Sequence, residues 1–188
     1  MPSPLPDFEL KGSYQEKNLR TIFCAASQLS RLLPYDGNIA HALSHVCENT
    51  GLMGRWQTLR QQPLVICDTG HNPAAWEYLA PQITSQPCRQ LRIVFGMVDD
   101  KDIDTVLAML PKHACYYFTQ ASTHRAIPSE HVAELARRHQ LNGNTYPSVA
   151  EAYQAAFAEA HHDDFIFIGG SGYVVADLLS SITFASHE

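Results

Sequence analysis

The stretch Leu64-Val-Ile-Cys-Asp68-Thr-Gly-His71-Asn-Pro73 decides the fold of this 188-residue chain. Its first four residues are apolar, which predicts a strand buried on both faces, and the strand then ends on an acid. Asn72 and Pro73 favour the start of a helix, because asparagine caps a first turn and proline fits its first position. A buried strand that leads through a short turn into a helix is the repeating unit of a parallel α/β sheet.

The same alternation continues to the end of the chain. Further apolar, β-branched runs predict strands at 91–95, 115–119 and 165–168, with a weaker one near residues 145–146. Helical segments are expected at 74–84, 102–110, 129–140, 149–160 and 173–182. Strands that are apolar on both faces and separated by helices indicate a sheet covered on both sides. We therefore predict a Rossmann-like, doubly wound α/β domain over residues 51–188, with a mostly parallel sheet of about five to six strands.

Residues 1–50 have a different pattern. Apolar residues recur at the helical period between Asn18 and Leu33, and Pro34 ends the run. A second, short helix is expected over residues 39–48. Two helices alone bury little apolar surface, so this region needs a partner. We expect it to be an incomplete helical piece whose apolar stripe promotes self-association of the chain through residues 18–33.

Composition excludes several classes of function. The net charge of −6 argues against a nucleic-acid surface or an anionic membrane face, and 45% apolar residues is ordinary for a globular protein. No stretch approaches the roughly 20 apolar residues that a bilayer span needs, and the first residues lack the features of a secretory signal. Five cysteines without C-x-x-C pairing indicate a reduced, cytoplasmic chain.

Three segments follow predicted strands at the sheet edge where doubly wound folds bind ligands. In the first, Asp68 is suited to accept hydrogen bonds from ribose hydroxyls, and His71 lies near a helix start, where anions are favoured. That Asp68 only caps a turn stays equally open. In the second, at 95–102, the acids fit helix capping better than ligand binding. The third, Ile168-Gly-Gly-Ser171-Gly172, is a weak signal for a backbone nest that holds an anion.

Other chemistries lack the residues that they require. Asp68-Thr-Gly matches the triplet of aspartic proteases, but that mechanism needs two such acids in an all-β fold. His41 and His45 have the spacing of a zinc helix without its glutamate, and the ten histidines, including the pair at 161–162, predict no metal site. The G-x-x-x-x-G-K-[ST] phosphate loop is absent from the sequence.

Taken together, several segments resemble the carboxy-terminal domain of folylpolyglutamate synthase/dihydrofolate synthase, a family of ATP-dependent Mur-type amide ligases. An earlier segment, residues 10–18, is similar to the end of the central ATPase domain of the same enzymes. The segments that carry the likeness occur in the family's order and are Arg55-Trp-Gln57, Asp68-Thr-Gly-His71-Asn-Pro73, Phe95-Gly-Met-Val-Asp-Asp-Lys-Asp102, Arg125-Ala-Ile-Pro128 and the stretch 170–179.

The resemblance implies an acyl-phosphate mechanism. ATP phosphorylates a carboxylate of dihydropteroate or of a folate, and the amine of L-glutamate then displaces phosphate to form an amide. In the family, the phosphate loop, the Mg²⁺ ligands and a carbamylated lysine belong to regions that nothing in this chain matches. The chain is therefore expected to be inactive by itself, and the full-length enzyme is expected to be a monomer.

The resemblance also implies roles for five residues. Asn18 corresponds to an adenine-contacting asparagine, and Arg55 and Asp68 correspond to ATP-binding residues, with Arg55 on phosphate oxygens and Asp68 on the ribose. His71 and Ser171 correspond to residues on the glutamate and γ-phosphate side of the cleft. No catalytic residue and no metal ligand is assigned.

Two alternatives remain open at this point. One is another amino-acid ligase of the same superfamily that uses a different acceptor. The other is a non-enzymatic α/β binding module, which the missing phosphate loop favours. The leading helices argue against this second alternative, because they need a partner that the module would not supply.

Overall fold

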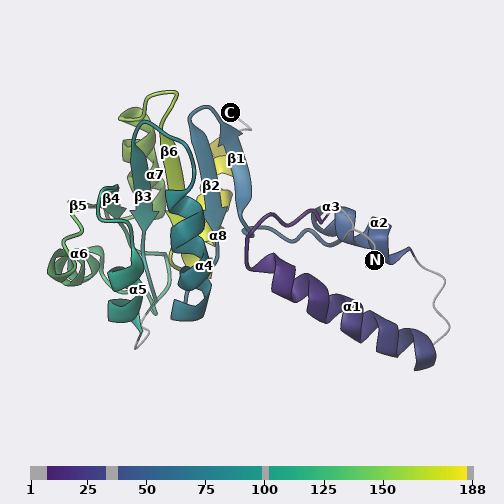
Figure 1. Ribbon diagram of the computed structural model, residues 1–188. Coiled ribbons are helices and arrows are strands. Elements are labelled where there is room, and N and C mark those ends of the chain that lie inside the picture. Colours follow the sequence, from purple (N-terminus) through teal and green to yellow (C-terminus); the bar gives the residue numbers. More distant parts are fainter. Residues whose placement is uncertain (1–7, 33–37, 99–101, 186–188) are drawn as a thin grey trace.

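The computed structural model describes residues 8–32, 38–98 and 102–185 (Figure 1). The predicted strands and helices of the α/β domain are confirmed, with ends that differ by at most three residues. The strands are β1 (Gln57–Gln61), β2 (Leu64–Asp68), β3 (Leu91–Phe95), β4 (Cys115–Phe118), β5 (Gly143–Thr145) and β6 (Phe165–Gly169). The helices are α1 (Gln15–Leu32), α2 (Ile39–Ser44), α3 (Val46–Thr50), α4 (Pro73–Thr84), α5 (Ile103–Met109), α6 (Ser129–Arg138), α7 (Val149–Ala158) and α8 (Gly172–Ala185).

The six strands form one sheet in the order β1-β2-β6-β3-β4-β5. Only β1 and β2 pair antiparallel, and all other neighbours are parallel, as a doubly wound fold requires. The sequence analysis did not predict β1, because Gln57-Thr-Leu-Arg-Gln61 is mostly polar. The structure explains that composition: β1 lies at the edge of the sheet, with most of its residues exposed.

Two apolar layers enclose the sheet. On one face, α4, α5 and α6 pack against strand residues such as Ile66, Phe95 and Phe167. On the other face, α7 and α8 pack against the residues between them in the strands, such as Val65 and Ile168. Figure 1 shows α4 and α5 in front of the sheet with α7 and α8 behind it. The inner strands β2, β6, β3 and β4 are therefore buried on both sides, which is why their sequences are mostly apolar.

The order of the strands creates a topological switch point between β2 and β6. Strands β2 and β6 are parallel neighbours, with Asp68 paired to Gly169, yet α4 leaves β2 on one face and α8 leaves β6 on the other. Such a switch point is where doubly wound sheets bind ligands. The loop after β6 needs its glycine at position 170: φ is +100°, and an added Cβ would lie 2.6 Å from the carbonyl oxygen of Gly96.

The leading segment contacts the domain along α4. The backbone N–H of Ser13 donates to Gln82 Oε1 (2.7 Å), and Gln82 Nε2 donates to the carbonyl of Lys11 (3.2 Å). On α1, Leu19 is buried, whereas Ile22 and Leu29 of the predicted stripe are 38% and 55% exposed. The apolar stripe is therefore only partly open. The division of the chain at residues 50 and 51 stays a prediction.

The helix predicted over residues 39–48 is wrong in one respect, because it is broken at His45. The His45 ring nitrogen Nδ1 lies 2.9 Å from both Ser44 Oγ and the carbonyl oxygen of His41. Side-chain bonds of this kind compete with the helical backbone pattern. No described helix combines the length and the apolar character that crossing a bilayer requires.

Candidate functional site

Asp68, the last residue of β2, is fully buried at the centre of the candidate site. Its Oδ1 accepts a hydrogen bond from the backbone N–H of Gly70 (2.8 Å). Its Oδ2 accepts from the backbone N–H of Trp56 (2.7 Å) and from the Tyr14 hydroxyl (2.9 Å). One carboxylate therefore connects the leading segment, the linker before β1 and the turn after β2.

The linker between α3 and β1, residues 51–56, contacts Asp68 and has an unusual backbone. Gly54 and Trp56 both have positive φ, 73° and 49°, and a left-handed conformation is uncommon for a residue as bulky as tryptophan. The backbone N–H of Thr69 donates to the carbonyl of Gly54 (2.9 Å), beside the bond from Trp56 to Asp68. These two bonds hold the linker in its left-handed conformation.

Asp68 lies at the sheet edge where the sequence analysis placed it, but its side chain is not exposed there. The reason is tertiary: the leading segment folds back so that the Tyr14 phenol, 54 residues earlier in the chain, reaches the carboxylate. Asp68 does cap a turn, through the bond from the Gly70 N–H. It also accepts two hydrogen bonds from residues farther away in the chain, Trp56 and Tyr14. A ribose contact at Asp68 stays a prediction.

Burial is the largest influence on the pKa values of Asp68 and Tyr14. It raises the pKa of Asp68 above the ordinary value, although the bonds from Gly70, Tyr14 and Trp56 and the positive charge of Arg55 act in the opposite direction. Burial and the adjacent Asp68 carboxylate also raise the pKa of the Tyr14 phenol. Tyr14 is therefore a neutral hydrogen-bond donor to Asp68 at physiological pH.

The predicted ATP-binding residues Asn18 and Arg55 line one cavity of about 500 Å³. Asn18 is exposed on α1, and its Nδ2 donates to Oε1 of the buried Gln15 (2.8 Å). Arg55 is half-buried on the linker. Tyr14 lines the same cavity and connects it to Asp68, so the structure brings all three predicted residues into one neighbourhood.

The predicted residues His71 and Ser171 line a second cavity, of about 520 Å³. His71 is exposed, whereas Ser171 is buried and its Oγ accepts from the backbone N–H of Tyr173 (3.1 Å) in the first turn of α8. Arg125 lines this cavity too, a residue to which the sequence analysis gave no role. The signal that could have selected Arg125 was its position in the Arg125-Ala-Ile-Pro128 segment, one of those that carry the family resemblance. A guanidinium near the start of α8 favours an anion such as a carboxylate or phosphate.

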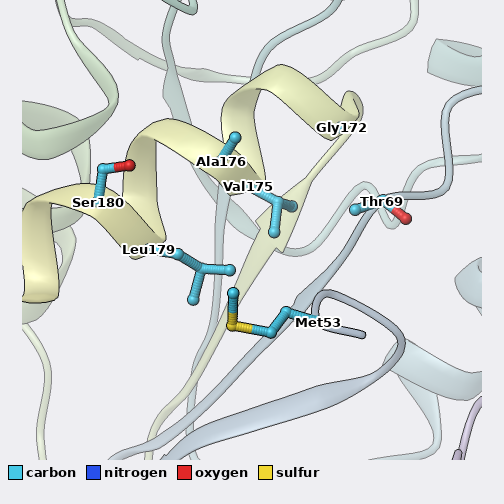
Figure 2. Close-up of a pocket in the computed structure, with 7 residues that line it drawn as sticks. All are labelled: Met53, Thr69, Gly172, Val175, Ala176, Leu179 and Ser180. Atoms are coloured by element: carbon cyan, nitrogen blue, oxygen red, sulfur yellow. The ribbon is translucent and has the colours of Figure 1, made fainter. Parts of the chain in front are cut away.

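A third cavity, of about 590 Å³, lies on the neighbouring side of α8. Figure 2 shows the side chains of Met53, Val175 and Leu179 directed toward one another across it. Among the described residues, those that line this cavity are all uncharged, so it suits an apolar group. Gly172 and Ala176 line both this cavity and the second one, which places the two on adjoining faces of the same helix.

The structure also bears on the prediction that the chain has no metal site. At the cleft, the described residues contain no group of three or more potential metal ligands. One such group lies elsewhere, formed by His161, His162 and Asp163 in the turn before β6. The sequence analysis noted the histidine pair but not that its ring nitrogens lie close to the next carboxylate.

Comparison with known proteins assigns the family. The profile described as "Mur ligase, glutamate ligase domain" matches residues 54–172, which is most of the chain. The chain therefore belongs to the Mur ligase family and contains its glutamate ligase domain. The match begins in the left-handed linker and ends at the first residue of α8, so it includes four of the five predicted site residues.

Within that family, the chain is similar to folate enzymes. It is 35% identical over 133 residues to the dihydrofolate synthase/folylpolyglutamate synthase of Escherichia coli, covering 70% of this chain and 31% of the relative. It is 30% identical over 177 residues to a Haloferax volcanii protein named as a probable bifunctional folylpolyglutamate synthase/dihydropteroate synthase, covering 93% and 20%.

A solved structure gives the same result. The Yersinia pestis bifunctional folylpolyglutamate synthase/dihydrofolate synthase, complexed with AMPPNP and a Mn ion, superposes with a TM-score of 0.65 at 28% identity. The alignment covers 79% of this chain and 35% of that one. The chain thus spans about a third or less of the length of these relatives.

Proposed function

We propose that this chain is the carboxy-terminal part of an ATP-dependent ligase that joins L-glutamate to the carboxylate of dihydropteroate or a folate. One observation carries the proposal. Two cavities, each lined by an arginine and other polar side chains among apolar ones, lie near the carboxyl end of β2: Asn18 and Arg55 line one, and His71, Arg125 and Ser171 line the other. A ligase of this type needs a nucleotide and an anionic amino acid on neighbouring sides of the reacting phosphate.

In this proposal, each residue has a binding or orienting role. The Arg55 guanidinium binds phosphate oxygens through charge-assisted hydrogen bonds, and Asn18 contacts the adenine. Asp68 accepts hydrogen bonds from the ribose after the Tyr14 hydroxyl has left it. Arg125, His71 and the first turn of α8 hold the glutamate carboxylate or the γ-phosphate.

The chemistry then proceeds by acyl transfer. The substrate carboxylate attacks the γ-phosphorus of ATP, which releases ADP and forms an acyl phosphate. The glutamate amine attacks the acyl carbon, the amide bond forms and phosphate leaves. As the family resemblance implies, we place the Mg²⁺ ligands in regions of the relatives that this chain does not cover.

Compartment and assembly belong to the same proposal. All five cysteines are free thiols, as a reduced compartment requires, which supports a cytoplasmic enzyme. We propose that the full-length enzyme is a monomer and that its missing regions cover the exposed residues of α1.

A chimera tests the proposal. This chain would replace the matching region of the E. coli relative, and amide formation from dihydropteroate or folate, ATP and L-glutamate would be measured. We expect activity, and Arg55→Lys should lower kcat/KM for ATP about tenfold, since an ammonium lacks the guanidinium fork. Arg137→Lys, an exposed change on α6, is the matched control.

Two results would refute this proposal. A chimera that keeps the circular dichroism spectrum of its parent but uses another amino acid or acceptor would favour a different Mur-type ligase. ADP binding to the isolated chain, followed by calorimetry, gives an independent measurement. Equal ADP affinity in the wild-type chain and in Arg55→Ala would contradict the nucleotide site.

A further inference from the structure

The turn between α7 and β6 gathers three metal-binding side chains at the edge of the sheet opposite the cleft. His161, His162 and Asp163 each offer one ligand atom, and these atoms all lie within 4.8 Å of one another. His162 Nε2 is 3.0 Å from one carboxylate oxygen of Asp163, and His161 Nδ1 is 3.9 Å from the other. The three side chains are 53% to 62% exposed, so an ion can reach them.

The backbone of this turn is held in place from beneath by Asp164. The backbone N–H of His161 donates to Asp164 Oδ2 (3.0 Å), and the N–H of Asp164 donates to the carbonyl of His161 (3.0 Å). The Asp164 carboxylate is itself buried and bonded to Arg89 (2.9 and 3.1 Å) and Arg92 (3.0 Å). The N–H of Arg89 also donates to the carbonyl of Asp163 (2.9 Å).

A turn whose backbone is already fixed reduces the conformational entropy that is lost when its side chains assemble around a metal ion. Ligand atoms around a tetrahedral zinc ion lie about 3.3 Å apart, which follows from metal–ligand bonds of about 2.0–2.1 Å. The separations here lie on both sides of this value, at 3.0 and 3.9 Å for the two histidine–Asp163 contacts and within 4.8 Å for the whole group. Rotations of the exposed side chains therefore bring all three atoms onto one ion. The backbone, fixed by Asp164, does not have to move.

We propose that His161, His162 and Asp163 form a binding site for a divalent transition-metal ion of the zinc type. Two imidazoles and one carboxylate are a donor set that favours Zn²⁺, Co²⁺, Ni²⁺ or Cu²⁺ over Mg²⁺ and Ca²⁺, which prefer oxygen ligands. Three protein ligands leave a coordination position for water. The site is independent of the proposed ligase activity, because it lies beyond the opposite end of β6 from Ser171. A bound ion would stabilise the turn that joins α7 to β6.

Zinc titration of the purified chain without a histidine tag tests this site. Zn²⁺ would be added in competition with a chromophoric chelator, and Co²⁺ absorption would report the coordination geometry. We expect one ion per chain with a dissociation constant in the micromolar range, a higher melting temperature with Zn²⁺ than with EDTA, and no such shift with 1 mM Mg²⁺.

Variants locate the ion. His162→Ala and Asp163→Asn should each weaken Zn²⁺ binding at least tenfold and abolish the zinc-dependent rise in melting temperature. The matched control is His41→Ala, because the His41 and His45 rings are stacked with centroids 4.2 Å apart and form a second close histidine pair, far from 161–162 in the chain. Melting temperatures in EDTA that equal the wild-type value show that the variants fold. Zn²⁺ affinity in His162→Ala within twofold of wild type, or a loss seen only in His41→Ala, would overturn the proposal.

Discussion

Replacing Asp68 with alanine removes the acceptor for two buried backbone N–H groups, those of Trp56 and Gly70, and for the Tyr14 hydroxyl. A buried donor without a partner costs about 1–3 kcal/mol. Relief from burying a carboxylate offsets part of this cost, as the raised pKa of Asp68 indicates. Tyr14 is only half-buried, so water can replace its lost partner. We expect the free energy of unfolding to fall by about 2–4 kcal/mol.

Urea denaturation of the chain, followed by circular dichroism, measures this loss, and the melting temperature should fall by roughly 5–15 °C. Tyr14→Phe is the matched control, since it removes one bond to the same carboxylate but leaves both backbone donors satisfied. It should cost less than about 1 kcal/mol. If Asp68→Ala is as stable as Tyr14→Phe, the two backbone bonds contribute nothing and the structural role assigned to Asp68 is incorrect.

Three further predictions concern pH, a buried ion pair and the exposed helix. Because the pKa of Asp68 is raised, its contribution to stability is fully present below about pH 4 and decreases as pH rises through the raised pKa. In urea denaturation, the difference in the free energy of unfolding between wild type and Asp68→Ala should therefore narrow from pH 4 to pH 7. A difference that widens over this range contradicts the prediction. Asp164→Asn should lower the free energy of unfolding by about 3 kcal/mol in the same assay, because it breaks the buried ion pair with Arg92. Glu134→Gln, which breaks an exposed pair with Arg138, should change it by less than about 0.5 kcal/mol. Similar losses in the two variants would refute the distinction. Leu29 on α1 is 55% exposed, so sedimentation should show concentration-dependent self-association that Leu29→Lys removes; a monomeric wild-type chain would be evidence against it.

Much of the candidate site was predictable from the sequence, by two different routes. Asp68, His71 and Ser171 follow apolar strands directly, so the residue pattern alone placed them at the ligand-binding edge of the sheet. Asn18 and Arg55 lie outside such a pattern, and only the family resemblance selected them. Arg125 received no role by either route, because no rule of local structure connects a loop after β4 with His71.

The sequence by itself determined the local structure of the α/β domain. Predominantly apolar runs set β2, β3 and β6, and capping residues such as Asn72 and Ser148 set the starts of α4 and α7, because both signals act over a few neighbouring residues. Only the tertiary structure decided the place of β6 between β2 and β3, the pairing of the polar edge strand β1, and the bond from Tyr14 to Asp68. Each of these joins segments through contacts whose energy depends on burial and on a partner elsewhere in the chain, which no local pattern encodes.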